Sequence, residues 1–209
     1  MNSYFILFLL ITASILPLIV LYIIFRKDNK ISLLYFLLSV SMGGISLLIA
    51  AIIQRFIPIP ANMGSIGVVF FSIFIRIALV EEGSRLITLF PLLKTGNKIQ
   101  DIGSASRLGL AAGLGFAALE NAFYGTIDIN IALLRIFSAS PLHGACGIRT
   151  AAALHKFPSE PVSAIFMFAS AILIHGAYNL IILIPIIPSL LAIPVALAAL
   201  LISLPLTRE

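Results

Sequence analysis

The chain has 209 residues, of which 61% are hydrophobic and only 10% are charged, and its mean hydropathy is +1.17. A water-soluble domain needs more charge than this to cover its surface, so the composition excludes a soluble globular protein. The formal net charge of +5 is explained by basic residues in cytoplasmic loops, and no nucleic-acid partner is expected. The composition therefore predicts an all-α, polytopic transmembrane helix bundle in a lipid bilayer.

Charged and turn-forming residues interrupt the apolar sequence at intervals that suit membrane spans. The first apolar run, Tyr4 to Phe25, is long enough to cross a bilayer, for which about 20 residues are needed. No basic residue precedes it and no small-residue cleavage site follows it, so we interpret it as a retained helix rather than a signal peptide. We expect about seven spans, at residues 4–25, 31–53, 66–92, 107–126, 131–154, 161–183 and 186–205.

No polar stretch is long enough for a separate soluble domain, so residues 1–209 are expected to form a single transmembrane domain. Its catalytic core is expected at approximately 66–183. The single cysteine, Cys146, cannot form an internal disulfide.

The loops on alternate sides of the expected spans differ in charge. One set is basic, whereas the other contains only Arg55, and Asp128 has no basic partner in its loop. Because basic residues stay in the cytoplasm, this predicts an outside N-terminus and a cytoplasmic C-terminus. The basic set comprises Arg26, Lys27, Lys30, Lys94, Lys98, Arg107, Arg149, Lys156 and Arg208.

The fourth expected span carries small residues at helical spacing. Gly109 and Gly113 are four residues apart, and Gly115 follows them. This spacing is typical of helices whose backbones pack closely in a membrane.

Two adjacent carboxylates lie within the third expected span, where an ionised group is costly. Glu81 and Glu82 point about 100° apart on a helix, so they do not pair with each other. Arg85 is four residues from the first and three from the second, so it can reach either. A structural ion pair with Arg85 accounts for one of the two glutamates and leaves the other without a partner. A buried carboxylate without a partner suits a general base.

A third carboxylate, Glu120, lies in an otherwise apolar part of the fourth span. No basic residue is within one turn of it, so its partner is expected on another helix, and Tyr124 lies one turn further on the same face. The alternative is a protonated glutamate that is hydrogen-bonded for packing.

The fifth and sixth spans each carry one histidine near the middle. His143 follows Pro141, which is expected to kink its helix, and His175 shares a helix face with Asn179. One such histidine is more often a packing residue than a functional one. Two of them, at depths similar to those of three carboxylates, predict one shared cavity, whereas His155 is expected at the membrane interface.

Carboxylates, histidines and an asparagine permit three kinds of function. A glutamate could activate water while histidine and asparagine stabilise an oxyanion. His143, His175 and a glutamate could instead hold a metal, although no His-Glu-x-x-His helix is present. The third kind is proton or cation transport.

The order of these motifs resembles that of the PrsW family of intramembrane proteases, which belongs with the CAAX prenyl endopeptidases. The resemblance covers roughly residues 75–182 and rests on four short motifs. The first departs from the usual pattern, because Arg85 stands where the family usually has lysine. The second has Glu120 where the CAAX branch has histidine, which favours the PrsW branch. The motifs are Glu81-Glu82-Gly83-Ser84-Arg85, Phe116 to Asn121 with Tyr124, His143, and His175 to Asn179.

The resemblance implies hydrolysis of a membrane-anchored protein such as an anti-sigma factor, in a bacterial cytoplasmic membrane. A non-catalytic scaffold of the same superfamily and a small transporter are the alternatives. A divalent metal such as zinc is a candidate cofactor, with Glu82, Glu120, His143 and His175 as its candidate ligands. The implied catalytic residues are Glu81, Glu82, Glu120, His143, His175 and Asn179, and the supporting ones are Arg85, Asn121 and Tyr124.

Overall fold

In a computed structural model, the described part of the chain consists of helices and their connections. The description covers all residues except 1–2, 27–30, 59–65, 96–100, 185–187 and 209, and it leaves out the side chains of residues 3–14. The charged turn at 27–30, most of the Pro58–Asn62 and Pro185–Pro188 breaks, and residues 96–100 of the Lys94–Arg107 break therefore lie outside the described residues.

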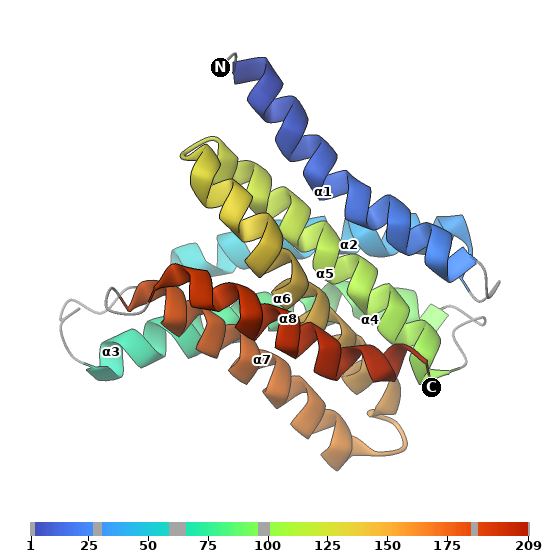
Figure 1. The fold of residues 1–209 in the computed structure, drawn as a ribbon. Helices are drawn as coiled ribbons and strands as arrows, with labels where there is room; N and C mark the ends of the chain where they lie inside the picture. The colour runs from blue at the N-terminus through green and yellow to red at the C-terminus, as the bar shows by residue number, and fades with distance from the viewer. Residues whose placement is uncertain (1–2, 27–30, 59–65, 96–100, 185–187, 209) are drawn as a thin grey trace.

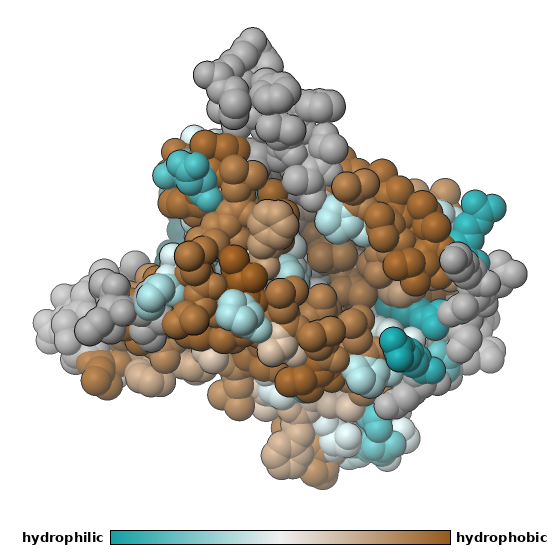
Figure 2. Space-filling view, in the orientation of Figure 1, coloured by the Kyte–Doolittle hydropathy of each residue, from teal (hydrophilic) through white to brown (hydrophobic). Residues whose placement is uncertain are grey.

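The all-α bundle of about seven spans is confirmed (Figure 1). Of the described residues, five stretches are long and apolar enough to cross a membrane. The face seen in Figure 2 is mostly hydrophobic, as expected where lipid is the solvent. The elements are α1 (Ser3–Arg26), α2 (Leu33–Phe56), α3 (Ile66–Phe70), η1 (Phe71–Leu79), α4 (Val80–Thr95), α5 (Ile102–Gly125), α6 (Ile129–Lys156), α7 (Pro161–Leu183), η2 (Ser189–Leu191), α8 (Ala192–Ser203) and η3 (Leu204–Thr207).

Two helices begin earlier than the apolar pattern predicts, because a side chain caps each of them. α5 begins at Ile102 rather than at 107, and the backbone N–H of Ser104 donates to the Asp101 carboxylate over 2.6 Å. α6 begins directly after Asp128, whose carboxylate accepts from the N–H of Asn130 over 2.8 Å. These carboxylates satisfy N–H groups that the first turn of a helix leaves without a partner.

The third expected span, 66–92, is one continuous helical stretch, but its middle is not a regular α-helix. α3 leads into the π-helix η1, and α4 then carries Glu81 and Glu82 in its first turn. Arg76 ties η1 to the end of α2, because its guanidinium donates to the carbonyl oxygens of Gln54 and Ile57, each over 3.0 Å. The wider turn of η1 thus lies directly before the two glutamates.

The seventh expected span, 186–205, is divided more than the sequence pattern suggests. A short 3-10 turn, η2, precedes α8, and a second one, η3, follows it. The stretch Ser189–Thr207 still has the length and composition of a span. Pro141 does not divide its span, since α6 is one helix from Ile129 to Lys156 with this proline inside it.

α5 is the central helix, packed between α2 and α6. Its glycines allow these contacts: a Cβ on Gly109 would overlap the carbonyl oxygen of Gly147, and a Cβ on Gly113 would overlap that of His143. Gly115 meets the backbone of Val40 on α2 in the same way. The close approach predicted from the glycine spacing is therefore confirmed.

We expect Gly113→Ala to destabilise the bundle by about 1–3 kcal/mol, because the methyl group would push α5 away from the backbone of His143. Thermal unfolding in detergent would measure the effect. Gly67→Ala is the matched control, since a Cβ there meets nothing within 4 Å. Equal stability of both variants and the unmodified chain would contradict a tight α5–α6 contact.

Candidate active site

Glu82 is fully buried, and both of its carboxylate oxygens have partners. Oε2 forms an ion pair with Arg85 and accepts a hydrogen bond from the Thr150 hydroxyl over 3.1 Å. Oε1 lies 2.9 Å from Nδ1 of His175. Arg85, which could reach either glutamate, thus pairs with Glu82, and the carboxylate holds α4, α6 and α7 together.

Arg85 also determines how His143 is protonated. Its guanidinium is fully buried, lies 4.7 Å from the centre of the Phe116 ring and places Nη2 3.3 Å from Nδ1 of His143. A guanidinium has no acceptor, so Nδ1 must accept and the ring proton lies on Nε2. Nε2 then donates to Oε2 of Glu120 over 2.9 Å. His143 is therefore a neutral link between two charged groups.

Glu120 finds its partners on another helix, as its apolar sequence surroundings predict. Besides His143, its Oε2 contacts the guanidinium of Arg135, and both belong to α6. The Arg135 guanidinium stacks over the Tyr124 ring, 4.0 Å from its centre. Tyr124 thus supports the cation that pairs with Glu120.

Glu81 differs from the other carboxylates because one of its oxygens has no hydrogen-bond partner. Oε1 accepts from the side-chain amide of Gln54 over 3.1 Å, whereas the buried Oε2 has none. Nε2 of His175 lies 3.5 Å from this oxygen. Nδ1 of His175 faces the ionised Glu82 and is its donor, so in the neutral imidazole Nε2 presents a lone pair toward Glu81.

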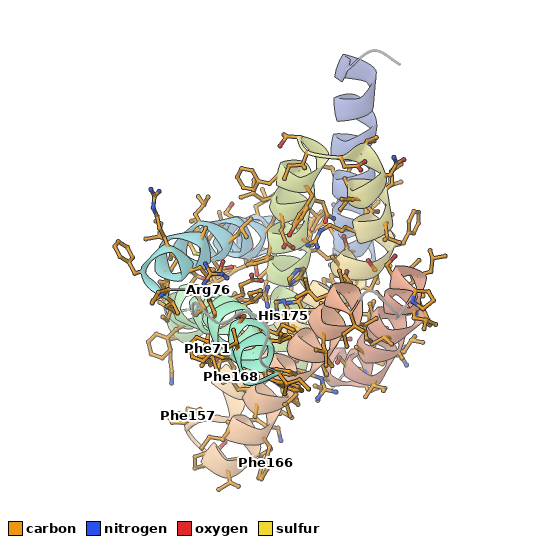
Figure 3. All side chains as sticks on the ribbon, turned by 90° about the vertical axis from the view of Figure 1, so that its left-hand side faces the viewer. Phe71, Arg76, Phe157, Phe166, Phe168 and His175 are labelled. Carbon is orange, nitrogen blue, oxygen red and sulfur yellow. The ribbon has the colours of Figure 1, made fainter. Side chains whose placement is uncertain are left out.

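These contacts join the five ionisable residues of the sequence analysis into one network beside a cavity of about 290 Å³. Glu82 and Arg85 do not line the cavity and support it from behind. Figure 3 shows His175 in the bundle interior and Arg76 on the neighbouring η1. The lining residues are Leu47, Gln54, Arg76, Ile77, Glu81, Glu120, Tyr124, Arg135, His143, His175, Tyr178, Asn179, Ile182 and Leu183.

The two asparagines of the predicted site are placed differently. Asn179 lies on the cavity wall, one turn after His175. Asn121 does not line the cavity, because its amide donates to the Ser140 hydroxyl over 3.1 Å. It connects α5 to α6.

Three residues of the network were not selected from the sequence. Arg135 lies within an apolar span, and the criterion applied to the glutamates would have found it. Gln54 follows the expected end of its span at residue 53, although α2 continues to Phe56. Thr150 has no sequence signal, because a threonine in a membrane helix is common and only its contact with Glu82 gives it a role.

The fold and the cavity define a multi-pass membrane protein with a charged site buried among its helices. A family model described as PrsW family intramembrane metalloprotease matches residues 30–206, so the chain belongs to that family and is a peptidase. No curated protein and no solved structure matches the chain significantly.

The family implies a metal, and the residues present fit one. Glu81, His143 and His175 each offer a ligand atom, and these atoms lie within 4.8 Å of one another. The 3.5 Å between Oε2 of Glu81 and Nε2 of His175 is close to the roughly 3.4 Å between two ligands of a tetrahedral zinc ion. His143 would have to give up one of its two hydrogen bonds to become a third ligand.

The structure thus brings Glu81 to the two histidines, whereas the ligand set expected from the sequence contained Glu82 and Glu120 instead. Each of those two carboxylates is paired with an arginine. Glu82, Cys146 and His175 form a second group that could hold a metal ion. Its carboxylate is also paired with an arginine, because Glu82 forms an ion pair with Arg85.

We expect the two neighbouring glutamates to differ sharply in their effect on stability. Glu82→Gln would leave the Arg85 charge buried without a counter-ion and should cost about 3–5 kcal/mol. Glu81→Gln keeps the contact with Gln54 and should change stability little. Thermal unfolding in detergent would measure both, and equal losses would contradict the different surroundings described for the two residues.

Proposed function

We propose that the protein hydrolyses a peptide bond of a membrane-anchored protein substrate in this cavity, with Glu81 as the carboxylate that contacts the attacking water. One observation carries the proposal: Oε2 of Glu81 is buried, lacks a hydrogen-bond partner and faces Nε2 of His175. Two lone-pair atoms 3.5 Å apart can bind one cation between them, and the free oxygen of Glu81 can accept a hydrogen bond from a water molecule on the cavity side. The carboxylate can then take a proton from that water.

His175 needs a fixed orientation for this role, and Glu82 supplies it. The hydrogen bond from Nδ1 to Glu82 keeps the lone pair of Nε2 on the cavity side. Arg85 and Thr150 hold Glu82 in turn. Glu82 is therefore a positioning residue, and its role is separate from that of Glu81.

The negative charge that develops on the substrate carbonyl needs a donor in the same cavity. The side chain of Asn179 lines the cavity one turn after His175 and carries an amide N–H₂ group. We assign it the role of stabilising the oxyanion, which a fixed donor in a water-poor site does effectively.

Glu81, His143 and His175 are also the residues that would hold a metal. A divalent ion bound there, such as zinc, would supply a Lewis acid. Glu120, the other carboxylate on the cavity wall, would then be the group that accepts the proton.

We propose an anti-sigma factor in a bacterial cytoplasmic membrane as the substrate, and residues 66–183 as the catalytic core. The cavity lies toward the bundle end where α2 and α7 finish and α6 begins, since Gln54, Arg135 and Leu183 line it. With the N-terminus outside and the C-terminus cytoplasmic, that end is the outer one. A cut there would fall in the outer part of the substrate.

We expect Glu81→Gln to reduce cleavage by at least about 100-fold, because the amide can neither accept a proton from water nor replace the carboxylate as a metal ligand. The measurement is an immunoblot for fragments of a co-expressed single-span anti-sigma factor tagged at both ends. Glu160→Gln is the matched control, since Glu160 is exposed and pairs only with Lys156 among the described residues. Unchanged cleavage by folded Glu81→Gln protein would overturn the assignment.

We expect the purified protein to contain a divalent metal, and Glu81→Gln or His175→Ala to lose it, because both remove a candidate ligand. Elemental analysis by mass spectrometry would measure the metal content, with Glu160→Gln retaining it. Full activity without a stoichiometric metal would leave Glu81 itself as the proton acceptor.

A further inference from the structure

A groove separate from the cavity runs between α4, α6 and α7, nearer the connection between α6 and α7. Its wall is apolar and its volume is about 290 Å³. Phe90, Phe157 and Ile165 are each about half exposed or more, so the groove is open to its surroundings. In Figure 3, Phe157 and Phe168 lie below His175 and Arg76. The groove is lined by Leu86, Phe90, Ala153, Leu154, Phe157, Ala164, Ile165 and Phe168.

The groove continues into a smaller, basic hollow at its end. The two share Phe90 and Leu154, and the hollow adds Leu93, Lys94 and His155. The Lys94 ammonium lies 6.0 Å from the centre of the Phe90 ring. In the part of the chain that the structure describes, no carboxylate pairs with Lys94 or His155.

We propose that this groove binds an anionic phospholipid, with an acyl chain against the apolar wall and the phosphate at Lys94 and His155. The charge supports this occupant, because an ammonium group and an imidazole that have no counter-ion among the described residues lie at the end of an apolar groove. Basic pockets between membrane helices bind anionic lipid headgroups for this reason. The proposal does not depend on the cleavage reaction.

The size of the groove favours a lipid chain over a transmembrane helix of a partner. Its volume of about 290 Å³ is just below the roughly 300–1,000 Å³ found for small-molecule pockets. A helix with its side chains is about 10–12 Å in diameter and would need a broad, shallow surface instead. A flexible acyl chain can lie against the apolar wall that α4, α6 and α7 form.

The test is native mass spectrometry of the purified protein after exchange into mixed micelles of phosphatidylglycerol and phosphatidylcholine with matched acyl chains. We expect the protein to retain phosphatidylglycerol about fivefold more than phosphatidylcholine, the preference expected from roughly one lysine near the phosphate. The double variant K94Q/H155Q should lose this preference. Arg55→Gln, which removes a cation near the other end of the bundle, should keep it.

A second variant checks the apolar part of the site. Ala164→Leu should fill the groove and lower retention of both lipids, while thermal unfolding verifies that the protein is folded. Equal retention of both lipids by the unmodified protein, or an unchanged preference in K94Q/H155Q, would overturn the proposal. A photo-crosslinker at Ile165 that captures the transmembrane helix of a partner in place of lipid would also overturn it.

Discussion

The buried ion pair between Glu82 and Arg85 is the interaction on which the rest of the site depends. Removing two charges from water is costly, and in this bundle the cost is offset by partners on two other helices: Thr150 and His143 on α6, and His175 on α7. The pair thereby fixes which nitrogen of each histidine carries the proton. The same contacts therefore compensate the buried charge and orient the imidazoles of His143 and His175.

The backbone contact between α5 and α6 is the second requirement, because it brings Glu120 to His143. The two residues belong to adjacent helices whose axes approach closely only where glycine replaces larger side chains. Gly113 lies against the peptide carbonyl of His143 itself. His143 therefore takes part both in the close helix contact and in the polar network. The glycines of α5 thus determine the geometry of the site as well as the packing of the bundle.

The sequence predicted the helices well, since apolar runs of span length leave few alternatives in lipid. It also selected the ionisable residues that the structure joins into one network, except Arg135, because buried charge is rare enough to stand out. The sequence could not predict which glutamate pairs with Arg85, because Arg85 is within reach of both. Thr150 and His175, which come from other helices, hold Glu82 in the position where it pairs with Arg85. Partners such as Gln54 come from the far end of another helix, which a local pattern does not reveal.

The π-helix η1 has a consequence for how this arrangement could change in evolution. Consecutive residues on a helix differ in direction by about 100°, so adding or removing one residue in η1 would turn the start of α4 by the same angle. Glu82 would then occupy the direction of Glu81 or the reverse. The length of η1, a segment without any carboxylate, thus decides which of two identical side chains lines the cavity and which one is buried behind it.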